Sequence, residues 1–471
     1  MRKIFLLITL LLPGCVTLPP MKQIQADLPA AWQEGDAQAT VAADWWKAYN
    51  DSTLNQLMIE ALEHNRDLKL AAARIEEVRA NLGLADADRF PEVQVGANVG
   101  RNRVTGKGNM PPGTPLVNNN FKLNLQAAWE VDLWGRYREA RAAARADLLA
   151  TEYARRGVQT SLTSAVAQSY FALAALDASL KLAQETLTNR REAIDLQRLR
   201  FEAGLNSELA LRQAEAEQAS VEISLAQHAQ QVRQQELALA VLLGREPRQI
   251  METGISRGML LAGISLPPTI PAGIPSDLLL RRPDLLQAQQ KLLSAQARIR
   301  EAGAAIYPNL SLTANLGSES KALSDLFSGP AAIWGLAAGL SQTVFNAGRT
   351  EAAIKAADAR QDQALIAYEQ NVQVAFREVL DALVMHRQAR EAGVAEARRV
   401  EALKRASELA ELRFKNGVSN YLEVLDARRN LFQAEQGGIE ARRGQLAASA
   451  YLFKALGGGW SGRLANASVT D

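Results

Sequence analysis

The segment "NFKLNLQAAWEVDLWGR", residues 120–136, alternates between apolar and polar side chains along most of its length. Successive side chains of a β-strand point to opposite faces, so a period of two predicts a long two-faced strand. The surrounding sequence is rich in Ala, Leu, Glu, Arg and Gln, which favour helix. A strand of this kind in a mostly helical chain needs a partner for each face. The apolar positions are Phe121, Leu123, Leu125, Trp129, Val131 and Leu133.

The second half of the chain repeats the first. "RFPEVQVGANVG" (89–100) aligns with "AIYPNLSLTANLG" (305–317) at an offset of 217 residues. "LRFEAGLNSEL" (199–209) aligns with "LRFKNGVSNYL" (412–422) at an offset of 213. The offset changes within a Gly-, Pro- and Asn-rich stretch before residue 120, and loops absorb such insertions easily. The sequence therefore predicts two internal repeats, each with a helix, two strands and a long helical hairpin.

The repeats predict the organisation of the whole chain. Pro- and Gly-rich sequence separates them, and residues at both ends show no periodicity. The expected segments are a signal peptide at 1–14, an N-terminal arm at 15–50, repeat 1 at 51–244, a linker at 245–275, repeat 2 at 276–457 and a tail at 458–471.

The four expected strands are 92–101, 120–133, 309–318 and 334–345. Each is about as long as the 9–11 residues that a tilted strand needs to cross a membrane. One apolar and one polar face is the pattern of a membrane barrel with a wet interior. We therefore expect Leu125 and Leu312 to face lipid, and Asn124 and Thr313 to face the lumen.

Four strands cannot close a membrane barrel, because bacterial barrels start at about eight strands. Open sheet edges in lipid would leave backbone amides without partners. Two copies would supply eight strands, and side chains would fill the lumen of a barrel of that size. Three copies would supply twelve, so a transport function favours a homotrimer that shares one barrel.

Two long helices are expected at about 138–203 and 350–416, since no proline interrupts either. About 65 residues at 1.5 Å each would reach on the order of 100 Å. Helices this long suggest coiled-coil packing. The turns "EAGLNS" and "KNGVSN" supply a glycine for positive φ and then a Ser or Asn that can cap the next helix. Each long helix should therefore fold back as a hairpin.

The chain begins with a basic "MRK", a short apolar run and "LPGC". This pattern predicts a secretory signal that is too short to span a bilayer. The single cysteine, Cys15, follows Gly14 and resembles the lipidated cysteine of a bacterial lipobox, although Pro13 departs from the usual residue there. Val16, which is not acidic, indicates the outer membrane. An ordinary buried cysteine is the alternative.

Composition argues against several other functions. The formal net charge is +2, which gives no reason to expect a nucleic-acid partner. Three scattered histidines do not suggest a metal site, and "TGKGNM" (105–110) lacks the spacing of a phosphate-binding loop. Carboxylate pairs such as Glu76 and Glu77 are typical of a solvated helix face. The sequence therefore predicts a protein that is not an enzyme and needs no cofactor.

Several motifs in order resemble the TolC-like outer-membrane efflux channels, in their lipoprotein branch often labelled NodT or OprM-like. They are "WEVDLWGR" (129–136), "GLNSELALRQAE" (204–215), "IPSDLLLRRPD" (274–284), "YPNLSLT" (307–313), "YLEVLDARRNLFQAEQ" (421–436) and "ALGGGW" (455–460). The resemblance implies a mostly α fold with a membrane β-barrel. A homotrimer would share twelve strands and continue as a long α-helical periplasmic tunnel.

The resemblance also implies function and partners. The chain would be the outer-membrane channel of a tripartite system that exports small molecules such as drugs. It would meet a periplasmic membrane-fusion adaptor and an inner-membrane pump of the resistance-nodulation-division (RND) type. Channels for type I-like protein or peptide secretion, or for metal-ion efflux, remain alternatives. A passive coiled-coil envelope lipoprotein would explain the helices and the lipobox but not the four strands.

Two sets of site residues follow from the resemblance. The hairpin turns would form the periplasmic tip where adaptor hairpins dock; these residues are Gly204, Leu205, Asn206, Ser207, Gly417, Val418, Ser419 and Asn420. The closed periplasmic gate would be held by Asp426, Arg413 and Phe414, where many relatives have tyrosine in place of Phe414. Repeat 1 has Gln213 at the position of Asp426, so an acidic ring would hold three carboxylates. The alternatives are that the tip residues only form the helix turns, and that Asp426 is a solvated aspartate on a helix surface.

Overall fold

The computed structural model describes residues 41–107, 111, 113, 115–267, 278–458 and 460. The predicted signal peptide, Cys15, residues 15–40 of the arm and most of the tail lie outside these residues. The described chain divides into two compact units. The first contains Arg74–Thr151 and Ala288–Tyr368, and the second contains residues 41–73, Glu152–Gln287 and the chain from Glu369 onward.

The order of elements is the same in the two halves of the chain. Each half has two shorter helices, two strands, a helix of 67 residues and a helix of 35 residues. In the first half these are α2 (Ser52–His64), α3 (Arg66–Ala87), β1 (Glu92–Arg103), β2 (Val117–Val131), α4 (Arg136–Glu202) and α5 (Glu208–Leu242). In the second half they are α7 (Leu278–Arg281), α8 (Pro283–Ala304), β3 (Asn309–Ser320), β4 (Ala332–Ser341), α9 (Arg349–Lys415) and α10 (Tyr421–Ala455).

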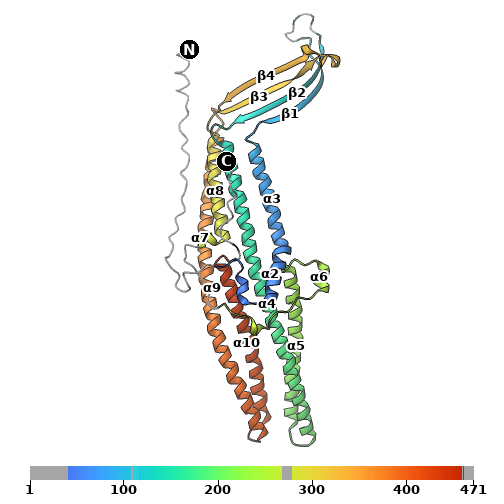
Figure 1. Ribbon diagram of the computed structural model, residues 1–471, viewed down its shortest axis with the longest axis vertical. Coiled ribbons are helices and arrows are strands. Elements are labelled where there is room, and N and C mark those ends of the chain that lie inside the picture. The colour runs from blue at the N-terminus through green and yellow to red at the C-terminus, as the bar shows by residue number, and fades with distance from the viewer. Residues whose placement is uncertain are drawn as a thin grey trace. The chain divides into compact units, whose positions relative to one another are not determined.

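The four strands form one antiparallel sheet in the order β1-β2-β3-β4 (Figure 1). Leu125 of β2 lies opposite Val95 of β1 and Leu316 of β3, and Leu316 lies opposite Trp334 of β4. Because side chains alternate along each strand, this row and the rows two residues away make an apolar face. Leu125 and Leu312 lie on that face, and Asn124 and Thr313 lie on the other.

The apolar face is tall enough for a membrane. On β2 it extends from Phe121 to Val131, which is about 33 Å along a strand at about 3.3 Å per residue. With the tilt of a barrel strand, this height approaches the apolar band of roughly 25 Å found on membrane barrels. Beyond it, the outward positions of β1 and β2 become polar at Arg101 and Asn119. On β3 the outward positions are already polar at Ser318 and Ser320, which lie opposite Leu123 and Phe121.

Two predicted strand boundaries are wrong by a few residues. The segment predicted at 120–133 forms β2 at Val117–Val131, and that predicted at 334–345 forms β4 at Ala332–Ser341. Strand β2 ends at Val131 because the side chain of the next residue, Asp132, bonds to the first turn of α4. Its carboxylate accepts the backbone N–H of Tyr137 at 3.2 Å and of Arg138 at 2.9 Å.

The last part of the predicted N-terminal arm is packed and helical. Residues Trp45–Tyr49 form the short helix η1, and the side chains of Trp45, Trp46 and Tyr49 are buried. The Trp45 ring stacks on Phe453 at 5.0 Å, and the Tyr49 hydroxyl lies 2.7 Å from Ser449 Oγ. The side chains of Trp45 and Tyr49 therefore anchor this end of the arm to α10.

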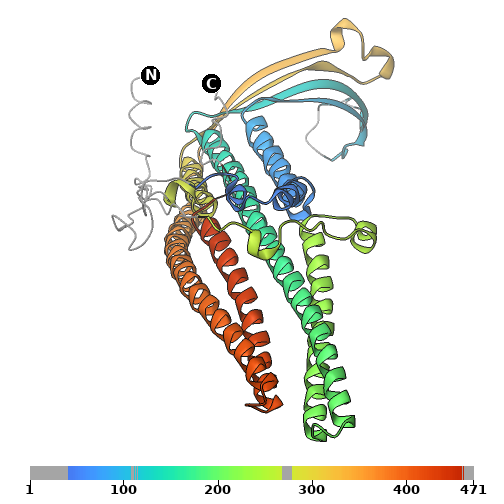
Figure 2. The ribbon, with the colours of Figure 1, turned by 60° about the horizontal axis from the view of Figure 1, so that its bottom comes forward.

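The linker between the repeats is also more ordered than its composition predicts. It contains the helix α6 (Pro247–Glu252), which has a proline in its first turn and a capping box formed by Glu246 and Gln249. It also contains the short helix η2 (Leu261–Gly263). The long helices match their predicted ranges within two residues, and each is followed by a shorter helix that runs back beside it (Figure 2). Among the described residues, no helix combines the length and the apolar character needed to cross a membrane.

Candidate functional site

The turn between α4 and α5 has the backbone that its sequence predicts. Gly204 has φ +70°. The N–H of Leu205 donates to Arg200 O at 2.8 Å, and the N–H of Gly204 donates to Phe201 O at 2.9 Å. These two bonds define a Schellman motif, which satisfies the last carbonyls of α4. The Ser207 hydroxyl then caps α5 by accepting the N–H of Ala210 at 3.4 Å.

The turn between α9 and α10 repeats this geometry. Gly417 has φ +71°. The N–H of Val418 donates to Arg413 O at 2.9 Å, and that of Gly417 donates to Phe414 O at 3.0 Å. Asn420 caps α10 by accepting the N–H of Glu423 at 3.2 Å. The predicted positive φ and both predicted caps are confirmed.

An apolar side chain lies exposed at each turn. A Schellman motif is often accompanied by a contact between the residue after the glycine and an apolar residue near the end of the helix. Here the helix supplies arginines at that position, and Leu205 and Val418 are 73% and 64% exposed. Each hairpin turn therefore presents a fixed backbone and one uncovered aliphatic side chain.

The predicted gate residues do not bind each other within one chain. Arg413 Nε donates to Glu423 Oε1 at 3.0 Å, whereas Arg429 Nη2 donates to Asp426 Oδ1 at 2.7 Å. Within one chain, Arg413 and Asp426 therefore have different partners. Glu423 lies one helical turn nearer the hairpin turn, so it meets Arg413 first. A bond between Arg413 of one chain and Asp426 of a neighbouring chain stays a prediction.

Phe414 joins an apolar cluster that links the two hairpins. The centre of the Phe414 ring lies 5.3 Å from that of the Tyr421 ring. The Arg200 guanidinium lies 5.0 Å from the centre of the Phe414 ring. The second contact is a cation–π interaction between α4 and α9. The buried members of the cluster come from all four long helices; they are Ile194, Leu211, Ala214, Ala410, Tyr421, Val424 and Leu425.

A buried arginine next to this cluster was missed by the sequence analysis. Arg190 is 4% exposed, and within the described part of the chain its Nε and Nη1 have no hydrogen-bond partner. Burial lowers the pKa of the Arg190 guanidinium. The residue lines a cavity of about 670 Å³ together with Glu411 and Arg428. Spacing could have revealed it, because Ala183, Leu187, Arg190, Ile194 and Gln197 follow the 4-3-4 pattern of a buried helix stripe.

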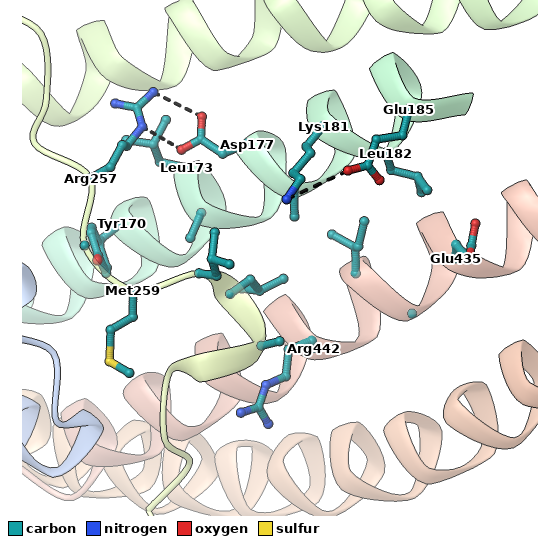
Figure 3. A pocket seen from close by; sticks show the side chains of 18 of the residues that line it. Tyr170, Leu173, Asp177, Lys181, Leu182, Glu185, Arg257, Met259, Glu435 and Arg442 are labelled. Carbon is teal, nitrogen blue, oxygen red and sulfur yellow. Dashed lines mark hydrogen bonds and ion pairs between the residues drawn. The ribbon is translucent and has the colours of Figure 1, made fainter. Parts of the chain in front are cut away.

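A second cavity, of about 720 Å³, lies where the linker crosses α4 and α10 (Figure 3). The linker is fastened there by Arg257, whose Nε donates to Asp177 at 2.6 Å. Asp51 accepts the Tyr170 hydroxyl at 2.6 Å and the backbone N–H of Met259 at 3.3 Å. Sequence reasoning missed these contacts because they join residues far apart in the chain.

Figure 3 shows charged side chains around a mostly aliphatic wall. Lys181 pairs with Glu185 at 3.8 Å. Glu435 of α10 lies nearby, and burial raises the pKa of its carboxyl group, with a further increase from Glu185 and an opposing effect of Lys404. Across the described ranges, no group of three or more His, Cys, Asp or Glu side chains is arranged to hold a metal ion.

Comparisons with known proteins identify the family. The sequence model described as "Outer membrane efflux protein" matches residues 57–245 and 274–458. The solvent efflux pump outer membrane protein SrpC of Pseudomonas putida is 36% identical over 461 residues, covering 96% of this chain and 97% of SrpC. The cation efflux system protein CusC of Escherichia coli O6:H1 is 33% identical over 459 residues, with 96% and 97% coverage.

Solved structures agree. The Campylobacter jejuni CmeC outer membrane channel superposes with a TM-score of 0.88 at 26% identity, covering 95% of each chain. The open state of the Neisseria gonorrhoeae MtrE outer membrane channel superposes with a TM-score of 0.85 at 31% identity, covering 94% of this chain and 98% of MtrE.

Proposed function

Because the chain belongs to the outer membrane efflux protein family, and is an efflux channel of the outer membrane, we propose that it exports small organic compounds. It does so together with a periplasmic adaptor and an RND-type inner-membrane pump. The predicted fold class is confirmed: four strands per chain contribute to the barrel of a homotrimer that also has an α-helical tunnel. Relatives named for solvent, toluene and antibiotic efflux pumps support the choice of organic substrates.

The observation that carries the adaptor proposal is the pair of hairpin turns. Both turns hold the same Schellman backbone, and each leaves one aliphatic side chain exposed, Leu205 or Val418. A helical hairpin of an adaptor could cover both apolar groups while polar groups at the rim stay wet, as in most protein interfaces. Three chains would present six such turns. The proposed docking residues remain Gly204, Leu205, Asn206, Ser207, Gly417, Val418, Ser419 and Asn420.

A photoreactive amino acid at position 205 or 418 tests this proposal in cells that express the chain with its candidate adaptor. We expect cross-links to the adaptor from both positions. Met251 of α6 is 79% exposed and provides the control position, which should give no cross-link. Adaptor cross-links from position 251 alone, or from none of the three positions in a strain whose resistance depends on this chain, would reject docking at the turns.

Export of metal cations is the second candidate, because CusC is similar to this chain over almost its whole length. A deletion strain complemented with the chain distinguishes the two candidates. Restored growth with toluene or antibiotics supports organic substrates, and restored growth only with metal salts supports the cation candidate. If the deletion removes a secreted protein from the medium and changes neither resistance, the result would favour protein secretion.

We further propose that Cys15 carries the lipid that anchors the chain. The residue lies outside the described part of the chain, and the proposal rests on the lipobox-like "LPGC" sequence. Mass spectrometry of the N-terminal peptide should show a diacylglyceryl cysteine, and Cys15→Ser should leave the signal peptide uncleaved. A mature N-terminus at any other residue would overturn the proposal.

The gate proposal assigns Asp426 on the one hand, and Arg413 and Phe414 on the other, to separate contacts within one chain. Three copies of Asp426 around the trimer axis would place a negative ring in the pore, which favours cations. Each carboxylate already has Arg429 of its own chain as a partner. Arg413 and Phe414 act through Glu423 and Tyr421, which they contact across the hairpin.

A further inference from the structure

The outward, apolar face of the sheet carries charge at one end only. The alternation of side chains along β1 places Val99, Arg101 and Arg103 on this face. Among the residues of the four described strands, these two arginines are the charged side chains of the outward face. Both are exposed, and within the described part of the chain neither side chain makes an ion pair or a hydrogen bond. Their level in the membrane therefore decides what they meet.

Aromatic residues mark the level at which the apolar face ends. Phe121 of β2 lies opposite Val99, and Trp334 of β4 lies opposite Leu316. The two aromatic residues are equivalent at the offset of 213 that aligns the repeats, and both lie on the outward face. Membrane barrels carry girdles of aromatic residues at their interfaces with water. Phe121 and Trp334 therefore place one membrane interface near Val99 and Leu316.

Arg101 and Arg103 lie just beyond this interface. They follow Val99 by about 7 and 13 Å along a strand that rises about 3.3 Å per residue, and the tilt of a barrel strand reduces both heights. Lipid head groups occupy roughly 5–8 Å on each side of the hydrocarbon core. A long arginine side chain can extend toward the head groups from either position. The two guanidinium groups therefore reach the level of the head groups.

This end of the sheet faces the cell exterior. β1 follows α3 and β2 leads into α4, so the connection between β1 and β2 lies at the end of the sheet opposite to both helices. The helices form the tunnel on the periplasmic side of the barrel. The head groups near the arginines are therefore those of the outer leaflet. In the outer membrane that leaflet consists of a phosphorylated glycolipid, whereas the inner leaflet consists of phospholipid.

The hairpin that carries the arginines holds no acidic residue. Residues 93–129 contain four basic side chains and neither Asp nor Glu. Lys122, on the lumen face, pairs with Glu319 of β3 at 3.5 Å. The two arginines, on the outward face, lie opposite Asn119 and Val117, which bring no charge. The positive charge of this surface is therefore left for an anion from outside the chain.

The second repeat has no charge at this level of its outward face. Ser318 and Ser320 of β3 are equivalent to Arg101 and Arg103 at the offset of 217. They end the apolar face of β3 after Leu316, and the strand continues to Ser320. Because serine is sufficient here, the strand does not need arginine to end its apolar face. A different requirement, the binding of an anionic lipid, accounts for the arginines of the first repeat.

We propose that Arg101 and Arg103 form a site for the phosphate groups of the glycolipid in the outer leaflet of the outer membrane. An arginine guanidinium donates two parallel N–H groups to phosphate oxygens. The two side chains are neighbours on one face of β1, so both contact the phosphorylated head group of one lipid. The acyl chains of that lipid then cover Val99 and Phe121 on the apolar face. A homotrimer carries three such sites, separated by the serine-bearing hairpins.

Titration of the purified full-length trimer with lipid A tests the site, and native mass spectrometry counts the lipids that stay bound. We expect saturation at three tightly bound lipid A molecules per trimer. The double variant Arg101→Ser with Arg103→Ser copies the second repeat. Its half-saturation concentration should be roughly 10- to 30-fold higher, which is the contribution of two basic residues at an anionic membrane surface. Lys122→Gln removes a positive charge from the lumen face of the same hairpin and should leave this concentration unchanged.

A second variant tests the site by gain of binding. Ser318→Arg with Ser320→Arg gives the second hairpin the arginines of the first. The number of tightly bound lipid A molecules should then rise from three to six per trimer. This variant keeps Arg101 and Arg103, so it decides the question even if the double serine variant does not assemble. An unchanged count of three would show that two arginines at this level do not make a lipid site.

Three other probes test the choice of ligand: lipid A without its phosphate groups, phosphatidylglycerol and inorganic phosphate. The first two should bind more weakly than intact lipid A, and inorganic phosphate at equal concentration should not displace it. Equal binding of dephosphorylated lipid A would assign the contact to acyl chains, and equal binding of phosphatidylglycerol would remove the preference for the glycolipid. Displacement by inorganic phosphate would indicate a site for free phosphate. Each of these results would overturn the proposal.

The serine variant has its own contrary outcomes. An unchanged half-saturation concentration, or an equal loss in Lys122→Gln, would show that the arginines of the outward face hold no lipid of their own. The inference uses only the barrel, so its failure would leave adaptor docking untouched.

Discussion

The two long helical hairpins have matching backbones and different side-chain chemistry. Their turn glycines differ by one degree in φ. At the same level of each hairpin, however, the charges of the ion pair between the helices are exchanged. In the first hairpin Arg198 of α4 lies 4.0 Å from Glu215 of α5, and in the second Glu411 of α9 lies 2.7 Å from Arg428 of α10. Glycines and caps fix the backbone, so the side chains between the helices are free to diverge.

Only the second hairpin has the side-chain contacts that are proposed for the gate. The second hairpin has Tyr421 and Glu423 as partners of Phe414 and Arg413. The equivalent positions of the first hairpin are Glu208 and Ala210, which cannot make the same contacts. Any gate built from these contacts therefore has three-fold symmetry, although the tunnel contains six similar hairpins.

The largest effect is expected where the hairpins return to the shorter helices. Gly244 and Gly457 are equivalent and both have positive φ, but an added Cβ would lie 2.2 Å from His64 O at Gly244 and 3.1 Å from Arg281 O at Gly457. Gly457→Ala should cost about 1–2 kcal/mol from the backbone conformation. Gly244→Ala should cost about 2–5 kcal/mol, because a backbone clash adds to it. Thermal unfolding at one protein concentration measures both, and equal losses would show that His64 moves aside freely.

Substitutions at the hairpin turns should weaken coupling to the adaptor before they prevent assembly of the trimer. At Gly204 and Gly417 an added Cβ has no neighbour within 4 Å. Replacement by valine should therefore cost only the strain of positive φ, about 1–2 kcal/mol, and the trimer should still assemble. The displaced turn should reduce drug resistance and adaptor cross-linking. Asparagine, which tolerates this conformation better, is the matched control. Normal resistance and normal cross-linking in both valine variants would remove the turns from the docking surface.

The exchanged ion pairs should differ in strength. Glu411 accepts both Nε and Nη2 of Arg428, at 2.8 and 2.7 Å, whereas Arg198 and Glu215 are only just in contact. A double-mutant cycle should give a coupling of about 1 kcal/mol for the second pair and about 0.2 kcal/mol for the first. The combination Glu411→Arg with Arg428→Glu should recover most of the loss caused by either change alone. Equal coupling energies in the two hairpins would contradict the difference in geometry.

Two equivalent glutamates should respond differently to pH. Burial raises the pKa of Glu435, while its equivalent, Glu222, pairs with Arg191 at 3.5 Å. A carboxyl whose pKa is higher in the folded chain destabilises the fold when ionised, and that cost disappears as the pH falls below the usual value of the unfolded chain. Glu435→Gln should therefore stabilise the trimer slightly at pH 7 and have less effect at pH 4. Glu222→Gln should not show this gain, and a gain in both variants would assign it to net charge.

The sequence predicts the parts that rest on local patterns. Residues 120–131 show a period of two, and Gly204 and Gly417 mark their turns, so strands, hairpins and caps could be predicted. Tyr49, Asp51 and Arg257 gave no such signal, because their partners Ser449, Tyr170 and Asp177 lie far away in the chain. The partner of Arg413 within its own chain could not be predicted from the sequence for a related reason. Helix spacing places Glu423 and Asp426 on the same side of α10, and only the geometry of the turn selects between them.

The smallest effect on stability is expected at Asp426, although the effect on conduction should be clear. Its bond to Arg429 joins neighbours on the surface of one helix, and such pairs contribute about 0.3–0.5 kcal/mol. Asp426→Ala should therefore leave the unfolding temperature nearly unchanged. It also removes a negative charge from each chain and leaves Arg429 without this partner. In planar bilayers the resting conductance should rise and the preference for cations should weaken.

Arg413→Ala separates the contribution of charge from that of the closing contact. It breaks the bond to Glu423 between α9 and α10, so the conductance should rise here too. It also removes a positive charge, so the cation preference should be kept or increased. Gln213→Ala, at the equivalent position of the first hairpin, should change neither property. If the Asp426→Ala channel keeps wild-type conductance and ion selectivity, the aspartate is a solvated surface residue, and the second hairpin gates the pore through Phe414 and Tyr421 or not at all.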